Sequence, residues 1–180
     1  MENIEKKIQR LIRYYERVVG TRNPMMIAQY LGIRVAIVPL GDIAGNYQLL
    51  KRKRWIFVNE EIPENSPFFQ VVVAHELGHA VLHRKENCAF IKNKTLLLTS
   101  GIEREANRFA AYLLITDDML KEYAGCTKEQ FCISTGYPKE LIELRLLFCR
   151  GDMDEDIVSV FRHYLCDDGD NCSAIKYSNF

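Results

Sequence analysis

The spacing of hydrophobic residues predicts a mainly helical chain interrupted by one short β-rich region. Four segments carry apolar residues every three to four positions, the period of a helix that buries one face. These segments are residues 2–19, 102–115, 139–149 and 154–165. Two shorter helices are predicted from capping signals. Asn23-Pro24 opens one over about 24–31, and the capping box Thr127-Lys128-Glu129-Gln130 opens one that continues to about Thr135.

Three segments rich in β-branched and aromatic residues predict strands: residues 33–38, 45–50 and 55–59. The second and third are joined by Lys51-Arg52-Lys53-Arg54, so a hairpin is the simplest interpretation. The basic tip indicates a solvated turn rather than a phosphate-binding patch, because the rest of the chain is not basic. Residues 86–100 lack clean periodicity and are expected to form a loop, in which Leu96-Leu97-Leu98 could pair briefly as a strand.

One further helix, capped by Ser66-Pro67 and continuing to about His83, is apolar around most of its circumference. Val71-Val72-Val73-Ala74 and Ala80-Val81-Leu82 flank its polar centre, which predicts a largely buried helix. The expected fold class is therefore α+β: a mainly helical domain with a small, mostly antiparallel three-stranded sheet packed on this helix.

The centre of this helix is the pentapeptide His75-Glu76-Leu77-Gly78-His79. Histidines four positions apart share one helix face, so both imidazoles can reach one zinc ion while Glu76 projects beside them. A surface helix that carries these letters by chance is the alternative. It is disfavoured because a buried helix must pair two histidines and a glutamate with something.

A catalytic zinc needs a third protein ligand. Lys85 and Leu82 stand where the longer histidine-rich pattern has histidine and glycine, which excludes that class. His83 lies a full turn beyond His79 and is expected to lie behind the metal ligands or to be a core histidine at the end of the helix. The better candidate is Glu103 on the following helix, with Asn107 on the same face to orient a ligand histidine. Glu105 projects away from that face and is expected to be solvated.

Composition narrows the function classes. Lys plus Arg and Asp plus Glu are both 24, so no global field favours a polyanion, and stable nucleic-acid binding is not expected. The 6 cysteines form no C-x-x-C pair, and neither a signal peptide nor a membrane-spanning run is visible, so a cytoplasmic protein is expected. One domain is predicted over 1–165, with a minimal core of about 20–125, a helical part of about 127–165 and a flexible tail over 166–180.

The two motifs together, HELGHAVLH and IEREANRFAAYLL, resemble the ImmA/IrrE family of zinc metallopeptidases over about residues 20–150. One departure is Ile115-Thr116, where relatives often have methionine and proline. The resemblance implies a zincin-like fold with a gluzincin-like site, in which His75, His79 and Glu103 bind Zn²⁺. It also implies an endopeptidase that cleaves a helix-turn-helix repressor of a phage or integrative element.

In the mechanism expected from these residues, Glu76 takes a proton from the attacking water and passes it to the leaving amine. The strand Trp55-Ile56-Phe57-Val58 is expected to offer an edge to an extended substrate. Tyr112, His163 and Tyr47 are candidates for stabilising the oxyanion.

Two other classes stay open. One is a non-proteolytic, metal-containing regulator that binds a repressor or DNA, which an intact Glu76 disfavours. The other is a DNA-binding module formed by the short helices within 131–146, which is disfavoured by Glu129, Glu140 and Glu143. No cofactor other than the metal is expected, and the oligomeric state does not follow from the sequence.

Overall fold

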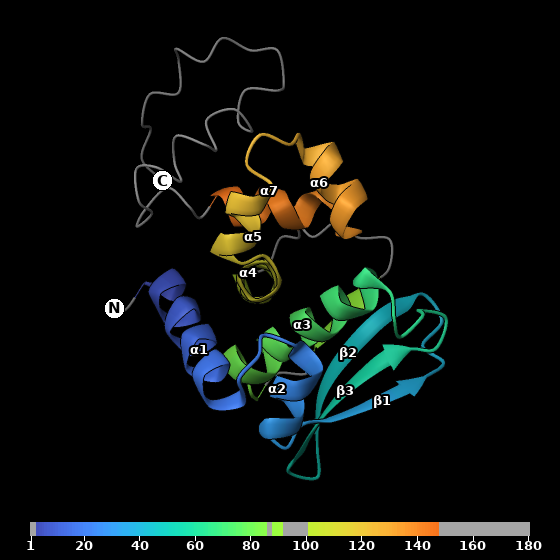
Figure 1. The fold of residues 1–180 in the computed structure, drawn as a ribbon. Coiled ribbons are helices and arrows are strands. Elements are labelled where there is room, and N and C mark those ends of the chain that lie inside the picture. Colours follow the sequence, from blue (N-terminus) through green and yellow to red (C-terminus); the bar gives the residue numbers. More distant parts are fainter. Residues whose placement is uncertain (1–2, 86–87, 92–100, 148–180) are drawn as a thin grey trace.

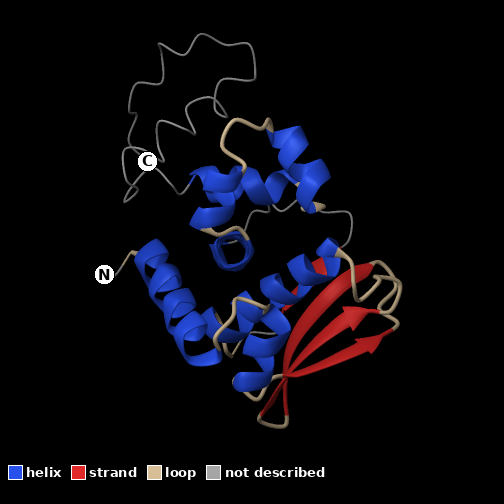
Figure 2. Ribbon diagram, viewed as in Figure 1, coloured by secondary structure: helices blue, strands red, loops and turns tan. Residues whose placement is uncertain are grey.

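The computed structural model describes residues 3–85, 88–91 and 101–147 (Figure 1). In chain order the elements are α1 (Ile4–Val19), α2 (Pro24–Tyr30), β1 (Arg34–Val38), β2 (Ile43–Leu50), β3 (Lys53–Asn59), α3 (Pro67–Leu82), β4 (Cys88–Ile91), α4 (Gly101–Leu114), α5 (Asp117–Glu122), α6 (Lys128–Thr135) and α7 (Lys139–Leu147). The α+β class is confirmed. Figure 2 shows the sheet on one side of the molecule and the described helices gathered on the other.

The four strands form one mixed sheet in the order β1-β3-β2-β4. β1 runs parallel to β3, whereas β2 is antiparallel to both β3 and β4, so the sheet is mostly antiparallel, as expected. The hairpin between β2 and β3 is also present. Its two-residue turn, Lys51-Arg52, has positive φ at both positions, the geometry that matches the twist of a tight hairpin.

The fourth strand and the sheet edges differ from the expectation. β4 lies within the segment expected to be a loop, and it pairs with β2 through its backbone. Four residues are too few to display an alternating pattern, so only tertiary pairing defines this strand. β3 was expected to be an edge, which is wrong: it is enclosed by β1 and β2 and has no free side for a substrate. The Leu96-Leu97-Leu98 segment lies outside the described residues.

Helix α3 is the centre of the core. Ser66 caps it by accepting a hydrogen bond from the Phe69 N–H, and Pro67 occupies the first turn, as predicted. Every residue from Val71 to Ala80 is buried, because the sheet covers one side of the helix and α4 covers another. A helix enclosed in this way holds its two histidines and its glutamate away from bulk solvent.

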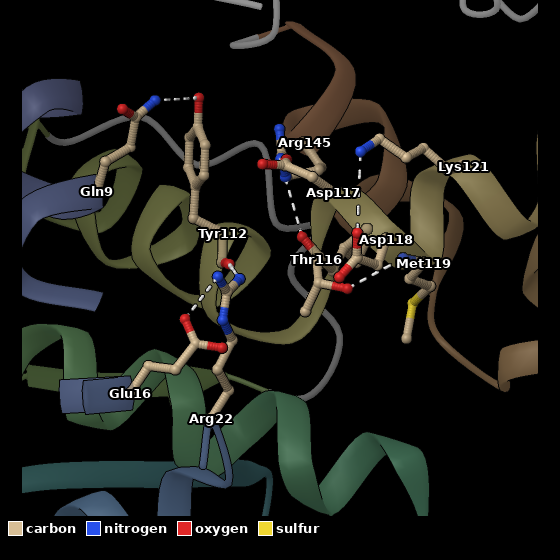
Figure 3. A network of polar contacts seen from close by, with 11 residues as sticks. Gln9, Glu16, Arg22, Tyr112, Thr116, Asp117, Asp118, Met119, Lys121 and Arg145 are labelled. Carbon is tan, nitrogen blue, oxygen red and sulfur yellow. Dashed lines mark hydrogen bonds and ion pairs between the residues drawn. The ribbon is translucent and has the colours of Figure 1, made fainter. Parts of the chain in front are cut away.

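The C-terminal helices hold α4 in place through Arg145, which is only 3% exposed. Figure 3 shows this side chain between α4, α5 and α7. Its Nε–H donates to the Ile115 carbonyl over 3.0 Å, its guanidinium pairs with Asp117, and its carbon lies 4.3 Å from the centre of the Tyr112 ring. Tyr112 in turn accepts a hydrogen bond from Gln9 of α1. These contacts fix α4, which carries Glu103 at its other end.

Helix α5 was not predicted, although Thr116 caps it and Asp117 and Asp118 occupy its first turn. No helix within the described parts of the chain has the length and apolar character needed to cross a bilayer. The helix predicted over 154–165 and the tail over 166–180 lie outside the described residues, so the proposed division of the chain stays a prediction.

Candidate metal centre

His75 and His79 lie on adjacent turns of α3 and are both fully buried. Their ring centroids are 4.7 Å apart and their planes are inclined by 76°. The two Nε2 atoms approach to 3.0 Å, so both point into the same small space. The spacing of four residues therefore converges the imidazoles as the helical period requires.

Glu103 reaches the same space from the first turn of α4. Its Oε2 lies 3.2 Å from His75 Nε2 and its Oε1 lies 3.4 Å from His79 Nε2. One ligand atom from each of the three side chains lies within 4.8 Å of the others. Two imidazole nitrogens and a carboxylate are a donor set suited to a divalent metal ion, zinc in particular.

Asn107, one turn after Glu103, lies behind His75 and is itself buried. Its Oδ1 is 2.7 Å from His75 Nδ1. A carbonyl oxygen can only accept, so Nδ1 carries a proton, which leaves Nε2 as the ring nitrogen available to a metal ion. This contact has the geometry that was expected of Asn107.

The close approach of α3 and α4 depends on Gly78, which lies between the two histidines. A Cβ atom at this position would lie 3.0 Å from Ala106 Cα and 3.2 Å from Phe109 Cβ. Those contacts are with backbone and with a buried ring residue, which have little room to move. The missing side chain therefore lets the helix bearing Glu103 pack directly against the helix bearing the histidines.

The charge state of Glu103 follows from its neighbours. Partial burial raises its pKa, but hydrogen bonds and charge interactions with His75 and His79 outweigh this effect, and the net pKa lies well below the ordinary value. Glu103 is therefore ionised at neutral pH, the state that a metal ligand requires.

Glu76 is fully buried beside these donors. Burial raises its pKa well above the ordinary value, and the negative charge of Glu103 raises it further, while the Tyr47 backbone partly opposes the shift. Strand β2 passes directly over this carboxylate: a Cβ at Gly45 would lie 2.5 Å from Val72 Cγ1 and 3.1 Å from Glu76 Oε1. A carboxylate with a raised pKa next to a metal-type donor set is suited to accept and return a proton.

His83 and Glu105 interact with each other at the margin of the site. His83 Nε2 lies 3.3 Å from Glu105 Oε2, and the His79 and His83 ring centroids are 6.0 Å apart. His83 caps α3 and does not join the three donors within the described residues. Glu105 was expected to be solvated, but it is only 31% exposed and contacts this histidine.

Two of the three oxyanion candidates are occupied elsewhere. The Tyr47 hydroxyl donates to the Arg84 carbonyl over 2.9 Å, and Tyr112 is on the side of α4 that faces α1 and Arg145. His163 lies outside the described residues. Tyr112 therefore points toward α1 and Arg145 and not toward the metal donors.

Sequence reasoning missed the two glycines that shape this centre, Gly45 and Gly78. Each lies inside a strand or helix, where glycine is unfavourable for its own element. A glycine at such a position is itself a signal in the sequence, since a glycine inside a helix or strand often marks a close approach of two backbones.

Comparison with known proteins supports this interpretation. A model of the IrrE N-terminal-like domain family matches residues 28–129, which include all three donors. The uncharacterized immunity region protein 2 of Bacillus phage phi105 is 36% identical over 145 residues, covering 79% of this chain and 88% of that protein. The metallopeptidase ImmA of Bacillus subtilis (strain 168) is 31% identical over 149 residues, covering 81% of this chain and 85% of that protein.

Proposed function

We propose that this chain is a cytoplasmic, zinc-dependent endopeptidase that cleaves a helix-turn-helix repressor of a phage or integrative element. The chain belongs to the IrrE N-terminal-like domain family and is homologous to a metallopeptidase. The observation that carries the proposal is the position of Glu76. A fully buried carboxylate lies beside two imidazoles and a second carboxylate, and a purely structural metal site has no use for it.

His75, His79 and Glu103 would hold the metal, and Asn107 would keep His75 in the tautomer that presents Nε2. When bound, zinc supplies Lewis-acid chemistry: it lowers the pKa of water to about 7 and polarises the scissile carbonyl. His83 and Glu105 stay outside this set and support the end of α3.

Glu76 would carry the proton through the reaction. Its carboxylate accepts a proton from the attacking water and then delivers it to the nitrogen of the leaving amine. Burial makes the carboxylate a stronger proton acceptor, because it raises the pKa of Glu76 above the ordinary value. The contacts of Val72 and Glu76 with β2 hold the carboxylate against the donors.

The substrate would add to the sheet at β4 instead of β3. β4 is an outer strand next to β2, and β2 is the strand that passes over Glu76. An extended segment paired with the outer edge of β4, which no other described strand contacts, would be held by main-chain hydrogen bonds near the donors. A cleavage site in an exposed, unstructured linker of the substrate would satisfy this geometry.

The repressor as substrate rests on two supports. One is the resemblance that the two sequence motifs carry, and the other is the phage relative, which is named as an immunity region protein. A repressor encoded next to this chain is therefore the first substrate to test.

The experiment compares the zinc-loaded chain with Glu76→Gln and with a control, Glu105→Gln, on purified repressor. The native chain and the control are expected to cut the repressor at one position. Glu76→Gln should retain its zinc, measured by elemental analysis, and lose cleavage. Cleavage by Glu76→Gln would reject the assigned role, and a zinc-loaded native chain that binds the repressor without cutting it would favour a non-proteolytic regulator.

A further inference from the structure

The face of the sheet that lies away from α3 carries side chains that the peptidase chemistry does not use. Ile56 and Val58 of β3 are fully buried, and Gly45, which pairs with Val58, lies against α3. Side chains alternate along a strand, so Trp55 and Phe57 point to the opposite face. Figures 1 and 2 show that the described helices gather on the α3 side. We call the opposite side the open face.

An arginine and two aromatic rings form a continuous surface on this open face. The rings of Trp55 and Phe57 stack with centroids 5.7 Å apart and an interplanar angle of 2°. Arg34 of β1 pairs with Trp55 in the sheet, and its guanidinium carbon lies 5.1 Å from the centre of the indole ring. Both rings are half-buried and so retain exposed surface. Flat aromatic rings beside a guanidinium are the surfaces on which unpaired nucleotide bases stack.

The neighbouring positions add positive charge. Lys51, Arg52 and Lys53 at the hairpin tip are exposed and precede Trp55 by only a few residues. The strand register places four neutral residues around the aromatic pair on this face: Ala36, Asn46, Gln48 and Leu50. Among these described positions there is no carboxylate to repel an anion. The zero net charge of the chain therefore conceals a locally basic face.

The arrangement also matches a known mode of recognition. Aromatic residues two positions apart on an interior strand of a four-stranded sheet, next to a basic residue, present rings on one face for stacking with bases. Here the strand reads Arg54-Trp55-Ile56-Phe57-Val58, and β3 is interior in the order β1-β3-β2-β4.

We propose that the open face binds single-stranded DNA, with bases stacked on Trp55 and Phe57 and with phosphates paired to Arg34 and the hairpin tip. Ala36 and Leu50 on this face offer apolar contact to deoxyribose and to the thymine methyl group, which favours DNA. This site is separate from the metal donors and does not depend on the proposed peptidase reaction.

The chain provides its own reporter, because Trp55 is its single tryptophan. Oligo(dT) of about 20 nucleotides, longer than the usual ~4–16-nucleotide site, is titrated into the full chain. Stacking should quench the tryptophan fluorescence in a saturable manner, and the anisotropy of labelled oligo(dT) gives the affinity. With about three phosphates neutralised, the slope of log K against log salt should be about −2.

Two variants test the parts of the site separately. Phe57→Leu keeps an apolar residue and the reporter but removes one ring, and it should weaken binding by about tenfold or more. Lys51→Gln with Arg52→Gln should weaken binding and bring the salt slope to less than half its native value. The matched control, Arg13→Gln with Arg17→Gln, removes two exposed cations of α1 and should leave the affinity unchanged. Thermal melting checks that each variant is folded.

Five outcomes would overturn the proposal. The first is the lack of saturable quenching at low salt, and the second is an equal loss of affinity in the α1 control. Oligo(U) that binds as tightly as oligo(dT) would contradict the choice of DNA. Polyglutamate that binds as tightly would show that the face recognises charge and fits an acidic protein segment. A blue shift of Trp55 emission with rising chain concentration, without any response to oligo(dT), would likewise assign the face to contacts between copies of the chain.

Discussion

At the scale of single residues, the metal centre depends on which side chains point into the space between His75, His79 and Glu103. Glu103 and Glu105 are two positions apart on one helix, yet one contacts His75 and His79 while the other contacts His83. Helical geometry separates their side chains by roughly 200° around the axis. The two carboxylates therefore form a natural matched pair for testing the metal centre.

Glu103→Ala should abolish stoichiometric zinc binding, because it leaves two imidazoles and no carboxylate among the donors. Glu105→Ala should retain zinc, because Glu105 contacts only the end of α3. Metal content after gel filtration, together with zinc titration, measures both. Zinc retained at full stoichiometry by Glu103→Ala would remove Glu103 from the ligand set.

Glu76 makes the stability of the metal-free chain depend on pH. Its pKa is raised in the folded protein, so between the ordinary value near 4.5 and the raised value the folded state binds more protons than the unfolded state. Stability should therefore fall as pH rises through this window. Glu76→Gln in chelator should be more stable than the native chain at neutral pH, and the difference should vanish below about pH 4. Urea denaturation at several pH values tests this, and a pH-independent difference would contradict it.

At the scale of elements, the site is a crossing of two helices beneath one strand. Gly78 allows α3 and α4 to touch, and Gly45 allows β2 to lie on Glu76. Neither glycine is needed for a positive φ, so each is explained by space alone. The distance between the donor helices is set by the size of the residue at this crossing.

Gly78→Ala should move α4 away from α3 and destabilise the chain by about 1–3 kcal/mol, the usual cost of overpacking. It should also weaken zinc binding, because Glu103 moves with α4. Gly101→Ala is the control: a Cβ there meets nothing within 4 Å, so stability and zinc affinity should be unchanged or slightly improved. Chemical denaturation and zinc titration measure both effects. If Gly78→Ala has the stability and the zinc affinity of the native chain, the helix crossing can accommodate a methyl group, which would contradict this prediction.

At the scale of the whole molecule, the metal centre depends on the C-terminal helices, which contribute none of its described donors. α7 and α1 both pack on α4, and Arg145 joins α7 to the end of α4 and to α5 (Figure 3). The buried guanidinium is satisfied by contacts with α4, with α5 and with Ile115 between them. The family match ends at residue 129, before α7 begins, so this support comes from outside the matched region.

Arg145→Ala should lower the free energy of unfolding by about 2–3 kcal/mol, because it removes a buried hydrogen bond, an ion pair and a stacked contact. Lys139→Ala on the same helix is the control. Its ion pair with Glu129 is exposed, so its loss should cost less than about 1 kcal/mol. Thermal and urea unfolding of both variants provide the comparison. Equal effects would show that Arg145 does not hold the C-terminal helices.

The sequence by itself determined the features that depend on local spacing. The helical period brought His75 and His79 to one face, and capping residues marked where α2, α3 and α6 begin. Two β-rich segments joined by a short basic turn placed the β2–β3 hairpin. These features depend on residues a few positions apart, and their physics is contained in those residues.

Only the tertiary structure decided the features that depend on packing between distant segments. It placed β3 in the interior of the sheet, recruited β4 from an expected loop, and turned Tyr112 away from the donors. The sequence named Glu103 and Asn107 as candidates, but their distances to His75 are set by the packing of α3 on α4 at Gly78. The order of strands and the facing sides of packed helices are set by long-range burial, which a local pattern of residues does not encode.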